Sequence, residues 1–236
     1  MRAIFHRELA TYFLTPIGYL YVGVFLSISS LIFGLNNLSS LTSDLSGLFS
    51  MMSYVWMLLT PVLVMRLLAG ERKQMTDQLL FTAPVRAGEV VLGKYLAACT
   101  VLLISVLLSL VYVLLVALQG RVYPEELFTL NLGFTLQGCA FIALDLMMSS
   151  LAKSPATATA LAFGANLFLW LATVASSGIS SRVVTRLNGF INLYDRLLPF
   201  LYGQLSLANI LFFLVFSGVC VFGTTQIVNA RRWSGQ

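Results

Sequence analysis

The segment "GEVVLGKY", Gly88 to Tyr95, has the spacing G-x-x-x-x-G-K of a phosphate-binding loop. Such a loop needs a tight glycine-rich turn, the lysine, and a following Ser or Thr that holds magnesium. Here bulky residues fill the turn, Tyr95 follows Lys94, and a long apolar run comes next. We therefore expect no ATP site. Lys94 and Tyr95 are instead typical of a helix that enters a membrane, with its amine reaching back to the interface.

Other residues capable of chemistry are few. His6 is the single histidine, and no apolar run contains paired acids. An enzyme within the membrane would need a nucleophile with its base, or clustered acids and metal ligands, so the enzyme hypothesis is disfavoured. The cysteines lie in apolar runs without C-x-x-C spacing, and we expect them to be packing residues rather than disulfides: Cys99, Cys139 and Cys220.

Asp145 lies in the apolar stretch "FIALDLMMSSLAK", about two helical turns before its end. An acid inside a membrane helix is costly when charged and unpaired, so it marks a candidate functional site. Two interpretations are open. In the one we favour, Asp145 forms a buried ion pair with Arg66 or Lys94; in the other it has a role in substrate binding or proton coupling.

The composition identifies the environment of these residues. Hydrophobic residues make up 58% of the 236 positions and charged residues 10%, whereas soluble domains carry about a quarter charged residues. The basic charges are scattered between apolar runs, which indicates membrane orientation and not nucleic-acid binding. We predict an all-α polytopic membrane protein with six crossings: Pro16–Leu35, Leu48–Leu68, Val90–Leu118, Leu130–Leu151, Thr157–Ala175 and Leu207–Val228.

The basic residues predict the orientation. Ten lie on the side of the two termini and four on the other side, so both termini are expected in the cytoplasm. The four are Arg121, Arg182, Arg186 and Arg196. We expect no cleavable signal peptide, since no small-residue cleavage site follows the first apolar run. The expected location is the bacterial cytoplasmic (inner) membrane.

We expect one membrane domain over residues 1–236, with three features outside the crossings. Residues 1–15 predict an interfacial amphipathic helix with Ile4, Phe5, Leu9, Tyr12 and Phe13 on one side, the alternative being a frayed polar tail. Residues 69–89 form a cytoplasmic coupling loop with a short amphipathic piece at 74–82, the alternative being an ordinary solvated loop. Residues 176–206 form an extracytoplasmic hairpin that is partly re-entrant.

The coupling loop carries a recognisable pattern. The chain supplies Met65-Arg66, Glu71-Arg72-Lys73-Gln74, Thr76, Leu79-Leu80, Pro84-Val85 and Val90-Val91-Leu92-Gly93-Lys94-Tyr95. Together with the opening "FHRELATYFLTPIGYL" and the six crossings, this pattern resembles the permease subunits of ABC-2-type transporters, especially the gliding-motility-type permeases. Met75 stands where that family usually has glycine.

The resemblance implies a permease subunit of an ATP-driven exporter, which binds no cofactor itself. ATP and Mg would be bound by a separate ABC ATPase subunit. That subunit would dock on the N-terminal helix and the coupling loop, at Arg7, Glu8, Glu71, Arg72, Lys73, Thr76, Asp77, Leu79, Leu80 and Pro84. Further partners are the lipid bilayer, a second permease copy or paralogue, and in some members an extracytoplasmic accessory protein.

Small residues recur every four positions in two crossings, which suits close helix packing: Gly23 and Ser27, then Ala156, Ala160 and Gly164. Most such stripes pack within a chain, but the resembled family places these two helices near a dimer interface. The alternative to a permease is a self-sufficient channel or secondary transporter, which would favour more polar residues at mid-membrane.

Overall fold

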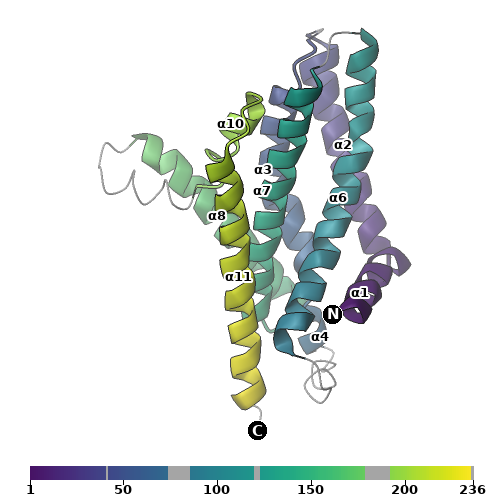
Figure 1. Ribbon diagram of the computed structural model, residues 1–236. Coiled ribbons are helices and arrows are strands. Elements are labelled where there is room, and N and C mark those ends of the chain that lie inside the picture. The colour runs from purple at the N-terminus through teal and green to yellow at the C-terminus, as the bar shows by residue number, and fades with distance from the viewer. Residues whose placement is uncertain (41, 74–85, 120–122, 179–191, 235–236) are drawn as a thin grey trace.

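The computed structural model describes residues 1–40, 42–73, 86–119, 123–178 and 192–234. The described residues are helical without strands, as predicted. Figure 1 shows long helices running side by side, with a short helix lying across one end. The elements are α1 Arg2–Leu14, α2 Pro16–Phe33, the π-helical turn Gly34–Leu38, α3 Ser46–Val64, α4 Ala69–Lys73, α6 Ala87–Gln119, α7 Pro124–Leu151, α8 Pro155–Gly178, α10 Leu198–Leu201 and α11 Leu207–Ser234.

Within the described residues, six helical stretches are long and apolar enough to cross a membrane, which agrees with the predicted number of crossings. The third, Ala87–Leu118, has 32 residues, or about 48 Å at 1.5 Å per residue. It exceeds a hydrocarbon core of about 30 Å, so it tilts or projects beyond it. The chain is a multi-pass membrane protein.

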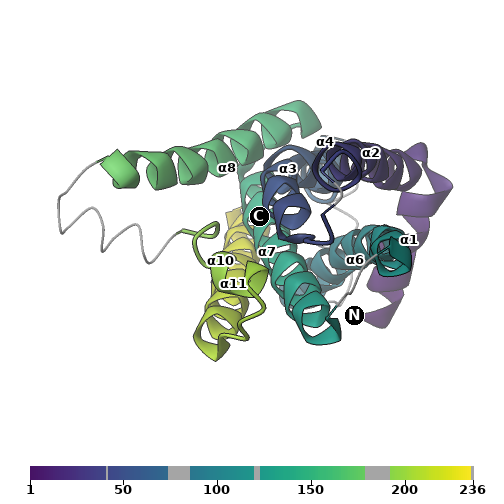
Figure 2. The ribbon, with the colours of Figure 1, turned by 90° about the horizontal axis from the view of Figure 1, so that it is seen from above.

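α7 lies at the centre of the bundle, with α3, α6, α8 and α11 around it (Figure 2). The core is built on stacked aromatic rings: Trp56 of α3 lies 4.6 Å from Phe134 of α7 and 5.2 Å from Phe25 of α2, between ring centroids. Gly138 makes this packing possible, because a Cβ there would lie 2.5 Å from Leu102 Cδ1 and 3.1 Å from Trp56. Residues of four helices therefore interlock around α7.

Local sequence explains where several helices begin. Pro16, Pro124 and Pro155 are the first residues of α2, α7 and α8, a position where the missing N–H costs nothing and the fixed φ suits a helix. Before α8, the backbone N–H of Thr157 donates to Ser154 Oγ at 3.3 Å, and the N–H of Ser154 donates to Thr157 Oγ1 at 3.1 Å. This reciprocal pair satisfies backbone donors that the helix leaves unpaired.

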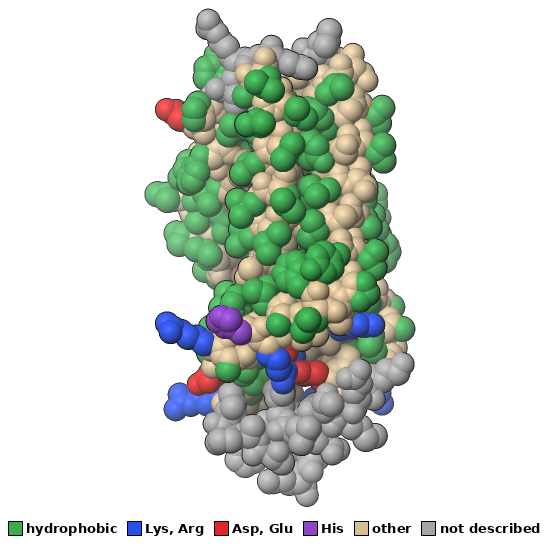
Figure 3. Space-filling model, turned by 90° about the vertical axis from the view of Figure 1, so that its right-hand side faces the viewer, with side chains coloured by type: hydrophobic (Ala, Val, Ile, Leu, Met, Phe, Trp, Pro, Cys, Tyr) green, Lys and Arg blue, Asp and Glu red, His purple; other side chains and the backbone are tan. Residues whose placement is uncertain are grey.

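Both described ends of the chain lie at the same end of the bundle, which we call the N/C end (Figure 1). α1 lies there against α2 and α6. Figure 3 shows hydrophobic side chains spread over the face above α1, with most of the visible charged side chains gathered at the N/C end and an acidic side chain near the opposite end. A helix is present over Arg2–Leu14, as predicted, and His6, Arg7 and Thr11 are exposed on it; its position at the membrane interface stays a prediction.

At the opposite end, residues 192–206 fold back along α7. Gln137 Nε2 donates to the Leu193 carbonyl at 3.3 Å, and Tyr194 stacks on Tyr54 of α3 at 5.0 Å. Gly133 of α7 allows α10 to pack closely, since a Cβ there would lie 2.5 Å from Phe200. Residues 179–191 of the predicted hairpin lie outside the described residues, and its re-entry into the membrane stays a prediction.

Candidate functional site

Four charged side chains from three elements form a closed ring at the N/C end. Arg7 Nη2 of α1 contacts Glu8 Oε1 at 2.7 Å and Glu71 Oε1 at 2.9 Å. Lys94 Nζ of α6 contacts the same two oxygens, at 3.1 Å and 2.8 Å. The ring holds two cations and two anions and is therefore neutral. It ties α1 and the start of the coupling loop to one transmembrane helix.

The ring runs from solvent into the protein. The side chain of Arg7 is 54% exposed, those of Glu71 and Glu8 are 19% and 10% exposed, and that of Lys94 is fully buried. The hydrogen bond from Arg7 to Glu8 raises the pKa of the Arg7 guanidinium, so this outer cation stays charged. A buried ammonium is tolerated only with close partners, and the two carboxylates supply them.

The helical period of α1 places Glu8 in the ring. Phe5, Leu9 and Tyr12 lie on the side of α1 that packs against the core, and Glu8 falls on that same side and is buried. Gly93 lets α1 approach α6, since a Cβ there would come 3.1 Å from Ile4 Cγ2. The Gly-Lys pair of the segment "GEVVLGKY" thus serves helix packing: its glycine admits α1 and its lysine binds the acid that α1 presents.

Tyr12 fixes the other side of α1. Its hydroxyl donates to the Leu63 carbonyl at 2.8 Å, near the end of α3. That carbonyl is free because the N–H of Leu67, its usual helical partner, bonds to the Val64 carbonyl at 3.0 Å instead. Burial raises the pKa of Tyr12 well above its usual value, so the hydroxyl keeps the proton that it donates.

α4 is held by a second contact besides the ring. Arg72 Nη1 donates to the Ala152 carbonyl at 3.0 Å, at the residue that follows the end of α7. A cation at a helix C-terminus also complements the helix dipole. α4 is therefore bound to α6 through Glu71 and to α7 through Arg72, two residues that we assigned to partner docking.

Most of the other residues that we assigned to partner docking have no described position. Thr76, Asp77, Leu79, Leu80 and Pro84 lie outside the described residues, as does the side chain of Lys73. The docking assignment of all ten residues stays a prediction. Within it, Glu8 and Glu71 already have intrachain partners, so their first role is to position α1 and α4.

The predicted ion pair of Asp145 is wrong. Lys94 binds Glu8 and Glu71, and Arg66 is exposed. Asp145 is fully buried, and no ion pair involves it among the residues that the structure describes. The expectation rested on depth in the membrane, but residues at similar depth meet only if their helices turn them toward each other.

The small-residue stripes do not pack within the chain. All five members are exposed: Gly23, Ser27, Ala156, Ala160 and Gly164. A Cβ added at Gly23 or Gly164 would meet no atom within 4 Å. Their helices, α2 and α8, both border α3 along one side of the bundle (Figure 2).

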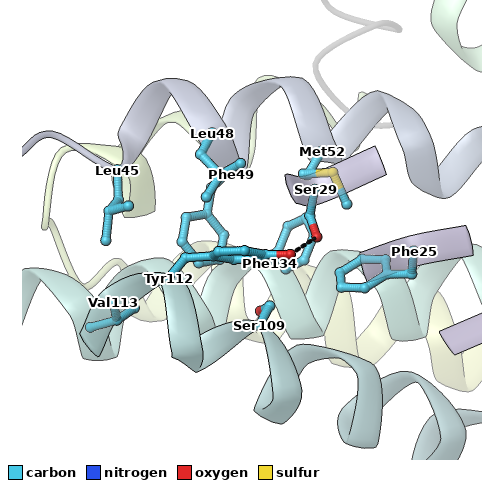
Figure 4. A pocket seen from close by; sticks show the side chains of 10 residues that line it. All are labelled: Phe25, Ser29, Leu45, Leu48, Phe49, Met52, Ser109, Tyr112, Val113 and Phe134. Carbon is cyan, nitrogen blue, oxygen red and sulfur yellow. Dashed lines mark hydrogen bonds between the residues drawn. The ribbon is translucent and has the colours of Figure 1, made fainter. Parts of the chain in front are cut away.

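A pocket between α2, α3, α6 and α7 does not provide a path for a solute. Phe25, Phe49 and Phe134 line it with other apolar side chains, and Ser29 Oγ lies 3.1 Å from the Tyr112 hydroxyl at its wall (Figure 4). Its volume of about 10 Å³ admits about one water molecule.

Three contacts at the N/C end were not predicted: the ring itself, the close approach at Gly93 and the bond from Tyr12 to the end of α3. A signal for the ring was present, because Glu8 interrupts the apolar side of the predicted amphipathic helix and Lys94 stands in an apolar run. A charge on an apolar face indicates a buried partner.

Comparison with known proteins agrees with this architecture. The chain matches the family model of the ABC-2 family transporter protein over residues 10–232. This range contains all six of the apolar helical stretches that could cross a membrane. The comparison with curated proteins gave no match.

Proposed function

Because the chain belongs to the ABC-2 family of transporter proteins and is an ABC transporter permease, we propose that it forms the translocation path of an ATP-driven exporter. Permeases of this family are transport components that typically pair with an ATPase subunit. In our proposal ATP and Mg are bound by that partner, and this chain binds no cofactor. The N/C end faces the cytoplasm of a bacterial inner membrane, where the partner docks on α1 and on residues 69–89.

One observation carries the proposal: the buried ammonium of Lys94 joins Glu8 of α1 to Glu71 of α4. A partner that pushes on the coupling loop must move a transmembrane helix for transport to follow. The ring supports this, since α4 and α1 are both fixed to α6 before residues 74–85 begin. Ion pairs with this burial are stiff connections, because separating them exposes charge within a low-dielectric region.

The proposed path lies between two copies of the chain, or between this chain and a paralogue. The pocket between α2, α3, α6 and α7 is about the size of one water molecule. The stripes on α2 and α8 are exposed and made of small residues, which suits close packing of transmembrane helices. In this arrangement, closure of the two ATPases tilts α6 of each copy and alternates access to the space between them.

The docking proposal is tested by co-expressing the chain with candidate ABC ATPase subunits and purifying it in detergent. Asp77→Arg reverses a charge in the proposed docking segment, and Glu125→Arg is a matched control at the opposite end, where Glu125 is exposed. We expect an ATPase to co-purify with the wild type and with Glu125→Arg, and to be lost with Asp77→Arg. Docking is refuted if Asp77→Arg and the control retain the ATPase equally.

A transport assay separates the permease from the channel alternative. Purified chain is reconstituted in liposomes with and without the ATPase, and accumulation of a candidate substrate is followed with and without ATP. Transport that requires both ATP and the partner supports the proposal. Transport by this chain alone contradicts it and favours a channel or secondary transporter.

A further inference from the structure

Asp145 lies in a buried polar cluster at the junction of α3, α7 and α8, away from the four-charge ring. Thr60 of α3 and Asn166 of α8 lie beside its carboxyl group. All three residues are fully buried, within helices that cross the membrane. Neither neighbour reaches hydrogen-bond geometry with the carboxyl, whose two oxygens have no hydrogen-bond donor among the described residues.

The nearby donors are used elsewhere, and Pro61 explains why. Proline has no N–H, so it leaves the carbonyl of Met57, four residues earlier, without its helical donor. Asn166 Nδ2 replaces that donor at 3.4 Å. The hydroxyl of Thr60 donates to the Trp56 carbonyl at 2.7 Å. Within this cluster, three buried oxygens then have no donor among the described residues: both carboxyl oxygens of Asp145 and Oδ1 of Asn166.

In the part of the chain that the structure describes, no ion pair compensates Asp145 from the elements around α7. On α6, Lys94 binds Glu8 and Glu71; on α4, Arg72 binds the Ala152 carbonyl. The remaining titratable neighbours are uncharged groups from three helices. They are Tyr21 of α2 and Cys220 of α11, which lie near Asp145, and Tyr95 of α6, whose hydroxyl donates to the Cys139 carbonyl at 3.4 Å.

We propose that Asp145 is a proton-binding site within the membrane and holds its proton when α8 is packed against α3 and α7. The proton removes a charge whose isolated burial is prohibitively costly. It also converts one acceptor into a donor, which can bond to Oδ1 of Asn166 and so satisfy two of the three oxygens. The proton comes from water, and it returns to water when α8 separates and the carboxyl is hydrated.

This site makes helix packing depend on pH. Separation of α8 exposes a carboxyl that ionises readily in water near neutral pH. The separated state therefore binds fewer protons than the packed state, and a rise in pH favours separation. The proposal concerns this chain alone and does not depend on the ATPase partner.

Infrared difference spectroscopy of the protein in lipid nanodiscs tests the proposal directly. We expect the wild type at neutral pH to show the carbonyl stretch of a protonated carboxylic acid, sensitive to D₂O. Asp145→Asn removes this band, while Asp44→Asn, a change at an exposed carboxylate, retains it. Asn166→Leu shifts the band to higher frequency without abolishing it, because the acid then loses its acceptor.

Stability measurements give a second readout. Asp145→Asn keeps the size of the side chain and fixes it as neutral, so we expect the fall in wild-type stability with rising pH to be reduced in this variant. The proposal is overturned if the wild type lacks the acid band at neutral pH, or if Asp44→Asn removes it. It is also overturned if Na⁺ or K⁺ stabilises the wild type but not Asp145→Asn, since a metal ion would then neutralise the carboxylate.

Discussion

Replacing Lys94 with methionine tests the ring at its most buried member. Methionine keeps the unbranched shape of lysine but removes the ammonium that both carboxylates contact. The oxygens of Glu8 and Glu71 lie no more than 5.9 Å apart, since the same nitrogen binds them at 3.1 and 2.8 Å. Without that nitrogen, two like charges face each other in a poorly hydrated space, and the exposed Arg7 is the cation of the ring that still contacts both.

The size of the effect follows from burial. Removing one partner of a buried ion pair costs about 3–5 kcal/mol. Here Arg7 remains bound to both acids, and Glu71 is partly exposed, so we expect the lower end, about 3 kcal/mol. For a chain of 236 residues, that corresponds to a fall in Tm of about 6–12 °C. The loss is concentrated where α1 and α4 meet α6.

Thermal unfolding in detergent and hydrogen exchange of residues 2–14 measure this loss. Lys153→Met is the matched control, because Lys153 is exposed and its removal is expected to change stability by no more than about 0.5 kcal/mol. Adding Glu8→Gln and Glu71→Gln to Lys94→Met restores most of the lost stability, since no unpaired buried charge remains. The reasoning fails if Lys94→Met behaves like Lys153→Met, or if the triple variant is less stable than Lys94→Met alone.

Two further substitutions test how α1 packs against α6 and α3. Gly93→Leu places a side chain where a Cβ alone would lie 3.1 Å from Ile4, so we expect it to lower the free energy of unfolding by about 1–3 kcal/mol and to speed hydrogen exchange in α1. Gly218→Leu is the control, because a Cβ there has no atom within 4 Å, and we expect neither effect from it. Tyr12→Phe leaves the buried Leu63 carbonyl without its donor and lowers unfolding stability by about 1–3 kcal/mol; unchanged stability would show that water replaces the hydroxyl.

The number and type of the helices could be predicted from the sequence because the bilayer allows few solutions. An apolar run of about 20 residues must satisfy its backbone hydrogen bonds internally, which in a single segment means a helix. The boundaries shifted by a few residues: the second crossing was predicted as Leu48–Leu68 and the apolar helical stretch runs over Ser46–Arg72. The helix over residues 1–15 could also be predicted from the sequence, since its apolar residues recur at helical spacing.

The partners of the charged residues could be predicted only in part. Hydropathy indicates how deep a residue lies in the membrane, and depth alone led to the prediction that Asp145 pairs with Arg66 or Lys94. It does not fix the direction in which each helix turns its side chains, because that depends on packing against neighbours. Glu8 was the informative residue, since an acid on the apolar side of a predicted helix requires a buried cation.

By itself, the sequence determined that this protein has six apolar helices long enough to cross a membrane, that most of its basic residues belong to the segments on the side of the two termini, and that Lys94 stands near the start of the third crossing. Local composition and period suffice for these conclusions. Only the tertiary structure decided that positions 7, 8, 71 and 94 form one ring and that Asp145 is left without a donor beside Asn166. Both depend on contacts between residues far apart in the chain, which arise when side-chain packing sets the rotation and spacing of whole helices.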